Sequence, residues 1–219
     1  MIVPLHLDDW LLVAEKPAGL LSVAGRGPAG EDCLHARVRR QWPDALVVHR
    51  LDMATSGLMV FARGIEAQRT LSRAFASREV EKRYVAVVAG VPRPMDPDAD
   101  GWSVIDLPLA ADWPARPRQK VDAAHGRPSL TRWRAIGGAP GPWGAGTLLE
   151  LEPVTGRSHQ LRVHLAAIGH PVVGDALYAP EPLALAASRL LLHAERLSLR
   201  HPGDGGAVAW NRAAPFRST

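Results

Sequence analysis

Short apolar runs separated by turn residues recur along this chain, and their spacing limits the folds that it can adopt. Runs such as ALVVH, LMVFA and KRYVAVVAG have the length and composition of buried strands. Most of the segments between such runs are shorter than the dozen or so residues that a crossover between parallel strands requires. The pattern therefore predicts an α+β fold with a mixed, mainly antiparallel central sheet flanked by a few helices and loops, and argues against a doubly wound sheet.

Three segments have helical periodicity. EDCLHARVRRQW repeats apolar residues four positions apart, and GIEAQRTLSRAFASR gathers them on one face. The third, SHQLRVHLAAIGHP, predicts a helix with Ser158 as its N-cap and Gly169 as its stop. Between two predicted strands, HGRP indicates a hairpin turn.

Composition places the chain among soluble globular proteins. Of its 219 residues, 47% are hydrophobic and 22% are charged. We find no internal repeat and expect a single domain over residues 1–219, with the Pro- and Asp-rich loop 92–101 as a candidate boundary between two subdomains. The N-terminus lacks a signal-peptide pattern, and no apolar run is long enough to span a membrane. Cys33, the single cysteine, permits no internal disulfide, so we expect a buried thiol in a cytoplasmic protein.

The positive charge of the chain resides almost entirely on arginine. The formal net charge is +4, and lysine occurs only at Lys16, Lys82 and Lys120. Arginine suits phosphates and base edges, but a genome rich in G and C explains the same excess. One segment, ADWPARPRQK, combines Arg116, Arg118 and Lys120 with an aromatic side chain. This basic loop is either an RNA contact or an ordinary solvated loop.

The stretch HRLDMATSG places Arg50 and Asp52 at the mouth of a predicted hairpin. Alternation along an extended chain puts these two side chains on one side. An aspartate before Thr-Ser-Gly is most often a structural turn residue. A carboxylate held on a loop between two rigid strands is also a suitable catalytic group.

The predicted helix after residue 158 carries a second candidate. Leu161, Leu165 and Ile168 form one apolar stripe, and Arg162 lies beside it. Such a guanidinium is either partly desolvated, in which case it needs an acceptor, or a rim side chain that reaches water.

The remaining candidates have simple structural alternatives. Tyr84 begins an apolar strand, so its ring either packs in the core or lines a pocket. His159 and His164 are five positions apart and share no helix face. We therefore expect His159 to be a capping or structural residue, His164 to be a partly buried histidine with hydrogen-bond partners, and zinc to be absent.

Taken together, these motifs resemble the RluA family of RNA pseudouridine synthases. The resemblance rests on HRLDMATSG, on KPAG upstream and KRYVA downstream, and on VTGRSHQLRVHLAAIGHPVVGDALY, and it covers the chain from Val13 to about Glu195. It implies the pseudouridine synthase catalytic fold, with two subdomains around a central RNA-binding cleft and no S4 RNA-binding domain. It also implies a monomer that needs no cofactor and no metal. The implied partners are RNA stem-loops, a 23S rRNA hairpin and the anticodon stem-loop of tRNA.

The resemblance also implies roles for four residues. Asp52 matches the catalytic aspartate, and Arg50 matches the arginine that enters the RNA when the target base leaves it. Tyr84 matches the tyrosine that stacks on the flipped uracil, and Arg162 matches the basic partner of the catalytic carboxylate.

Two other functions remain open alternatives. A non-catalytic RNA-binding or RNA-chaperone module would share the fold and the basic surface. A hydrolase of N-glycosidic bonds would use Asp52 but would also need a group that activates water.

Overall fold

The computed structural model describes residues 1–25 and 27–217, and the chain divides into two compact units. Unit 1 contains Met1–Lys82 and Ala194–Ala213, and unit 2 contains Arg83–His193 with the C-terminal residues from Ala214 onward. The loop 92–101, proposed from the sequence as a boundary, lies inside unit 2. Within the described ranges, none of the helices has the length and apolar composition that crossing a bilayer requires.

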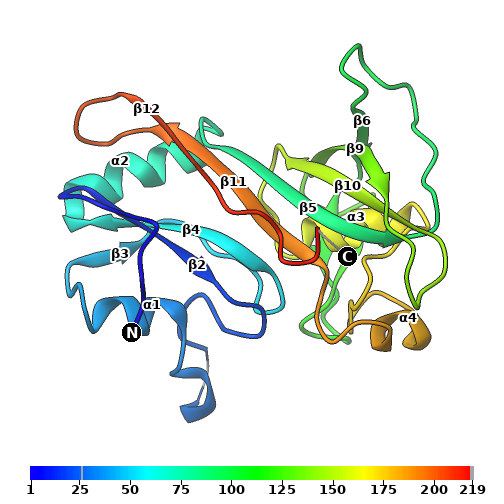
Figure 1. Ribbon diagram of the computed structural model, residues 1–219, viewed down its shortest axis with the longest axis horizontal. Coiled ribbons are helices and arrows are strands. Elements are labelled where there is room, and N and C mark those ends of the chain that lie inside the picture. Colours follow the sequence, from blue (N-terminus) through cyan, green and yellow to red (C-terminus); the bar gives the residue numbers. More distant parts are fainter. Residues whose placement is uncertain (26, 218–219) are drawn as a thin grey trace. The chain divides into compact units, whose positions relative to one another are not determined.

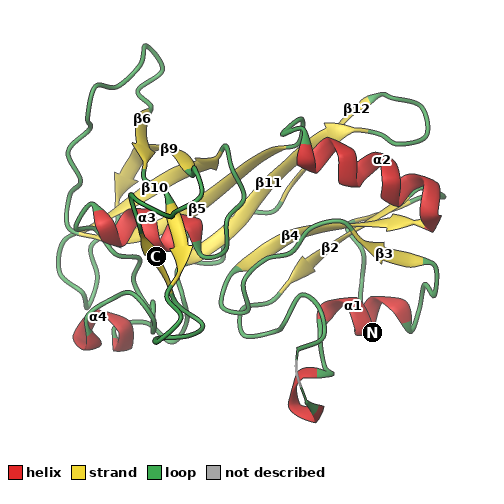
Figure 2. Ribbon diagram, turned by 180° about the vertical axis from the view of Figure 1, so that it is seen from behind, coloured by secondary structure: helices red, strands yellow, loops and turns green. Residues whose placement is uncertain are grey.

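Unit 1 is a sheet with a helix on each face. Its strands follow the order β1-β2-β4-β11, with β3 paired to β4 and β12 paired to β11. Figures 1 and 2 show α1 and α2 on opposite faces of β2, β3 and β4. The elements are β1 (His6–Leu7), β2 (Leu11–Lys16), the 3-10 turn η1 (Pro28–Gly30), α1 (Leu34–Arg39), β3 (Ala45–Val47), β4 (Ser56–Arg63), α2 (Gly64–Ala76), β11 (Leu192–Arg200) and β12 (Ala207–Asn211).

Burial on both faces explains why β2 and β4 are almost continuously apolar. One face packs against α2, where Val13 and Val60 join Leu71 in a single cluster. The other face carries Phe61, whose ring stacks on His35 of α1. A strand covered on both sides cannot alternate polar and apolar residues, so the sequence shows an apolar run.

Unit 2 contains four antiparallel strands and a separate two-stranded hairpin. Its strands follow the order β5-β10-β9-β6, and β7 pairs with β8 separately (Figure 1). A cluster that includes Val85, Val87 and Val173 forms part of its core. The elements are β5 (Glu81–Ala89), β6 (Ser103–Asp106), β7 (Leu109–Ala111), β8 (Gln119–Val121), β9 (Leu130–Gly138), β10 (Gly146–Pro153), α3 (Gln160–Ala167) and α4 (Glu181–Leu185).

The α+β class and the three predicted helices are confirmed, with two corrections elsewhere. The HGRP segment does turn, but it does not join two paired strands, because β8 pairs with β7 while β9 pairs with β6 and β10. Alternation reveals that a strand exists but not which strand it pairs with. The sequence analysis also did not identify the two-residue strand β1 or the short helix α4.

The loop 92–101 is held against the sheet of unit 2 by arginines. Trp102, directly after the loop, is buried, and its ring lies 4.6–5.0 Å from three guanidinium carbons. One of these, Arg132, also pairs with Asp98 of the loop at 2.7 Å. Cation–π contacts and an ion pair therefore fix a segment that its composition marks only as a surface loop. The three arginines are Arg83, Arg132 and Arg134.

Candidate active site

A buried serine fixes the residue before Asp52. The Ser22 hydroxyl donates to the carbonyl of Leu51 at 2.6 Å and accepts from its amide at 3.0 Å. Ser22 and Leu51 are both buried. Because one side chain satisfies both backbone groups of Leu51, the loop cannot rotate there without leaving buried polar atoms unpaired.

A buried lysine fixes the residue after Asp52. Lys16 is completely buried, and its ammonium donates to the carbonyl of Met53 at 2.9 Å. The same ammonium donates to the carbonyls of Pro17 and Leu20 at 2.8 Å and 2.7 Å. These three bonds use all three donors of the ammonium. The KPAG and GLLSV segments thus hold Asp52 between two anchored neighbours, and the Asp52 carboxylate is carried on a rigid loop.

The end of this loop requires glycine. The loop closes with a hydrogen bond from the Thr55 amide to the Asp52 carbonyl at 3.1 Å. Gly57 then adopts φ +119°, and a Cβ there would lie 2.3 Å from the carbonyl oxygen of Ala194 in β11. Glycine therefore allows β11 to lie against the strand that leaves the loop. Asp52 is half-buried at this turn, whereas Arg50 is exposed.

His49, which precedes Arg50, is a structural residue rather than a proton donor. Its Nε2 accepts from the amide of Val60 at 3.0 Å, and its ring stacks on Phe75 at 4.6 Å. Loss of solvent, together with the nearby charge of Lys82, lowers the pKa of His49 to about 3. The imidazole is therefore neutral at neutral pH.

In unit 2, Arg162 forms a buried ion pair with Asp175. Its Nε and Nη2 donate to the two oxygens of Asp175 at 2.8 Å and 2.6 Å, and the Arg162 side chain is only 4% exposed. The interpretation of Arg162 as a desolvated guanidinium with an acceptor is confirmed, and the rim alternative is wrong. The sequence analysis did not identify Asp175, although the GDALY motif in which it lies was part of the resemblance. Pairing of Arg162 with Asp52 stays a prediction.

The turn before α3 corrects the predicted N-cap. The helix begins at Gln160, and its N-cap is His159, which adopts the left-handed φ of 54° and makes no capping hydrogen bond. The N-cap position therefore belongs to His159 and not to Ser158. The Gln160 side chain organises the turn instead, because its Oε1 accepts from the Arg157 amide at 3.0 Å and from the Thr155 hydroxyl at 2.7 Å.

The other two candidates of unit 2 lie where the sequence analysis expected them. His164 is buried with both ring nitrogens bonded, to the Thr131 hydroxyl and to the Leu107 carbonyl, each at 2.9 Å. Burial lowers its pKa, so it is a neutral structural histidine. Tyr84 is half-buried in β5, opposite Leu151 of β10.

The basic loop is the tip of the β7–β8 hairpin. Arg116 and Arg118 are exposed, and the Arg116 guanidinium lies 3.5 Å from the ring centre of Trp113, which is 67% exposed. Arg118 lies 5.4 Å from the ring of Tyr178. Lys120 pairs with Asp122 at 3.4 Å, so its charge is partly compensated. The two arginines are the less compensated cations of this loop.

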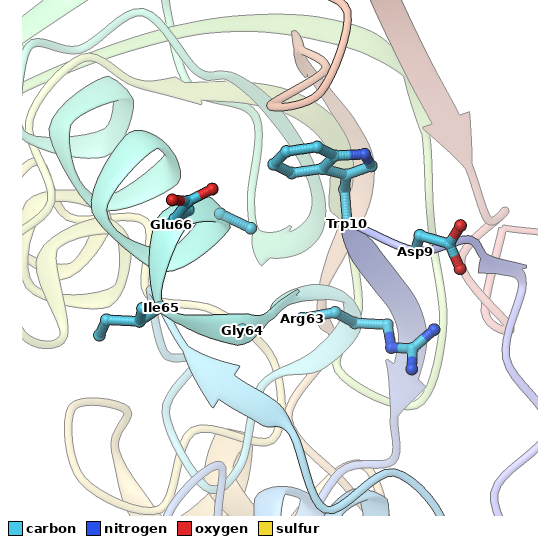
Figure 3. Close-up of a pocket in the computed structure, with 7 residues that line it drawn as sticks. Asp9, Trp10, Arg63, Gly64, Ile65 and Glu66 are labelled. Carbon is cyan, nitrogen blue, oxygen red and sulfur yellow. The ribbon is translucent and has the colours of Figure 1, made fainter.

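A surface pocket of unit 1 lies apart from these groups (Figure 3). It occupies the start of α2, and none of its lining residues is a predicted site residue. Within residues 1–25 and 27–217, no group of three or more His, Cys, Asp or Glu side chains is placed to hold a metal ion. The pocket is lined by Asp9, Trp10, Arg63, Gly64, Ile65, Glu66 and Ala67.

Comparison with known proteins identifies the family of this chain. The family model described as RNA pseudouridylate synthase matches residues 10–167, so the chain belongs to that family. The protein named dual-specificity RNA pseudouridine synthase RluA from Escherichia coli K12 is 46% identical over 98% of this chain and 94% of its own length. Its namesake from Yersinia pestis is 44% identical over 98% of this chain and its own full length.

Solved structures agree with this assignment. Human RNA pseudouridylate synthase domain containing 1 superposes with a TM-score of 0.80 and 27% identity, covering 99% of this chain and 84% of the human chain. The chain is therefore an RNA pseudouridine synthase, an isomerase, and the resemblance identified from its motifs is confirmed.

The anchoring of Leu51 predicts the effect of removing one hydroxyl. Ser22→Ala leaves the buried amide and carbonyl of Leu51 unpaired, so we expect it to lower the free energy of unfolding by about 1–3 kcal/mol. Because Asp52 follows directly, we also expect kcat to fall by about tenfold or more. Urea unfolding and single-turnover kinetics measure the two effects. Ser77→Ala is the matched control, since the Ser77 hydroxyl bonds only one exposed helix carbonyl in the described contacts; equal effects of the two variants would contradict the prediction.

The neutral His49 predicts a pH dependence of stability. In the unfolded chain His49 binds a proton near pH 6.5, whereas the folded chain does not until about pH 3. Acidification through this window favours the unfolded chain. His49 therefore lowers the free energy of unfolding by up to about 1.4 kcal/mol for each pH unit below pH 6.5. Urea unfolding at pH 7.5, 6.5, 5.5 and 4.5 should show a shallower decline for His49→Gln than for the wild type. Parallel curves would show that His49 titrates normally in the folded protein.

Proposed function

We propose that this protein converts specific uridines to pseudouridine in a 23S rRNA hairpin and in the anticodon stem-loop of tRNA, as a cytoplasmic monomer. The two RluA relatives, which are named as dual-specificity enzymes, support this proposal because they are 44–46% identical to this chain over almost their full length. One observation carries the catalytic part of the proposal. The Asp52 carboxylate lies between Leu51 and Met53, whose backbones are anchored by buried side chains.

The chemistry explains why a fixed carboxylate suffices as the reactive group. Pseudouridine formation breaks the bond between C1′ of the ribose and N1 of uracil, turns the base, and rejoins it through C5. The base and the sugar supply every atom, so the reaction needs no cofactor. The protein must supply a base or nucleophile, hold the detached ring and exclude water. We assign the first of these roles to Asp52.

Arg50 and Tyr84 have the chemistry for exposing the target base. Extracting a base from its stack costs a few kcal/mol, and stacking it on an aromatic ring returns about 1–3 kcal/mol. Tyr84 is the ring that we assign to this contact. Arg50 is exposed, and we assign its guanidinium to the space that the base leaves in the RNA.

Arg162 is the proposed basic partner of the Asp52 carboxylate. The ion pair with Asp175 holds its Nε and Nη2, which fixes the plane of the guanidinium. A cation whose direction is fixed in this way is suited to keeping a nearby carboxylate ionised in a water-poor site. A non-catalytic RNA-binding module would not need Asp52 to be ionised beside an arginine.

Neutralising Asp52 tests the catalytic assignment. In a tritium-release assay on C5-labelled uridine RNA, we expect Asp52→Asn to lose at least about a thousandfold in rate, because an amide can act neither as nucleophile nor as base. RNA binding and the unfolding midpoint should change little. Asp9→Asn removes an exposed carboxylate at the Figure 3 pocket and serves as the control, with full activity expected. An active Asp52→Asn protein would refute the mechanism, and free uracil as the product would identify a hydrolase instead.

The exposed arginines of the basic loop predict a change in salt dependence. If Arg116 contacts a phosphate, Arg116→Ala should weaken RNA binding and reduce the slope of log K against log salt by about 1. Filter binding between 50 mM and 300 mM salt measures the slope. Arg200→Ala, which removes an exposed arginine in β11, is the charge-matched control. An unchanged slope for Arg116→Ala would exclude this loop as a phosphate contact.

A further inference from the structure

Tyr178 lies where the basic loop meets the turn before α3. Its hydroxyl accepts a hydrogen bond at 2.8 Å from the amide of Gln119, which lies in the basic loop between Arg118 and Lys120. The same hydroxyl lies 2.6 Å from Nδ1 of His159, the residue before α3. A hydroxyl that accepts from an amide keeps its own proton to donate, so we assign Tyr178 as the donor to His159. One phenol therefore connects two segments 40 residues apart.

The ring of Tyr178 connects the same loop to Arg162. The guanidinium carbon of Arg118 lies 5.4 Å from the ring centre, and that of Arg162 lies 5.0 Å from it. Both distances are within the range of cation–π contacts. Arg118 is exposed, whereas Arg162 is buried. The ring thus contacts one arginine that is available to RNA and one that belongs to the proposed catalytic group.

The Tyr178 backbone is held by the Arg162–Asp175 ion pair. Its amide donates to Oδ1 of Asp175 at 3.2 Å, and the same oxygen accepts from Nη2 of Arg162 at 2.6 Å. His159, on the other side, adopts a left-handed conformation that non-glycine residues rarely adopt. Its ring meets that of Tyr178 edge to face at 5.6 Å. These contacts stabilise a strained residue at the start of the helix that carries Arg162.

We propose that Tyr178 is a positioning residue for the pseudouridylation reaction. It ties the basic loop to Arg162, so that RNA seated on Arg118 is held at a fixed place with respect to that guanidinium. The inference rests on the proposed function of the basic loop as an RNA contact. Tyr178 acts through Arg118 and Arg162 and takes no chemical step itself.

Two substitutions separate the hydroxyl from the ring. Tyr178→Phe keeps a ring near both guanidiniums but releases Gln119 and His159, so we expect KM for an anticodon stem-loop RNA to rise about tenfold with kcat within about threefold of wild type. Tyr178→Leu also removes the ring contact with Arg162, and we expect kcat to fall at least tenfold further. Thermal unfolding monitors stability; because the Phe variant preserves shape, it keeps the test valid if the Leu variant fails to fold.

A double-mutant cycle distinguishes positioning from general stability. In an Arg118→Ala background, Tyr178→Phe should raise KM less than twofold, because the contact through which it acts is already lost. In an Arg200→Ala background, the tenfold effect should persist. Equal effects of Tyr178→Phe in both backgrounds would overturn the Tyr178 proposal alone. If Arg118→Ala itself leaves both KM and the salt slope unchanged, the basic loop is not an RNA contact. That result would overturn the positioning role of Tyr178 as well.

Discussion

The buried ammonium of Lys16 holds the loop that carries Asp52 in place. Removing a full charge from water is costly unless strong acceptors replace the lost hydration. Here three backbone carbonyls do so, and one of them belongs to Met53, beside Asp52. The same hydrogen bonds therefore replace the lost hydration of the lysine and hold the backbone of the loop in place. Ser22 completes the arrangement from the opposite side of Asp52.

In unit 2, buried charges also obtain hydrogen bonds in place of water, here from an ion pair. Arg162 and Asp175 are both buried, and each satisfies the other's charge through two hydrogen bonds. A buried ion pair of this kind contributes little net stability but strongly favours a single geometry. Tyr178 contacts Arg162 through its ring, and its hydroxyl bonds His159 at the start of α3 and Gln119 in the basic loop. The proposed functional residues of each unit are thus supported by buried polar contacts as well as by the apolar core.

The errors of the sequence analysis share one physical cause. Ser158 was the expected N-cap because serine is a good capping residue, yet the Gln160 side chain already satisfies the turn and His159 occupies the cap position. HGRP was expected to join paired strands, yet β8 pairs with the strand before it. In both places local chemistry allowed several solutions, and contacts with distant segments selected among them. Predictions based on long periodic segments, such as α2 and β5, did not depend on such contacts.

Residue order alone was enough to predict the class of fold, the family and the residues that match the family motifs. Apolar periodicity is a local property, and family motifs are read directly from residue order, so neither needs a partner segment. Only the tertiary structure decided what holds those residues in place. The bonds from Lys16 to Met53 and from Ser22 to Leu51, which anchor the neighbours of Asp52, join positions 37 and 29 residues apart. The link from Gln119 to Tyr178 joins positions 59 residues apart. Such contacts arise when folding brings the segments together, so residue order alone does not reveal them.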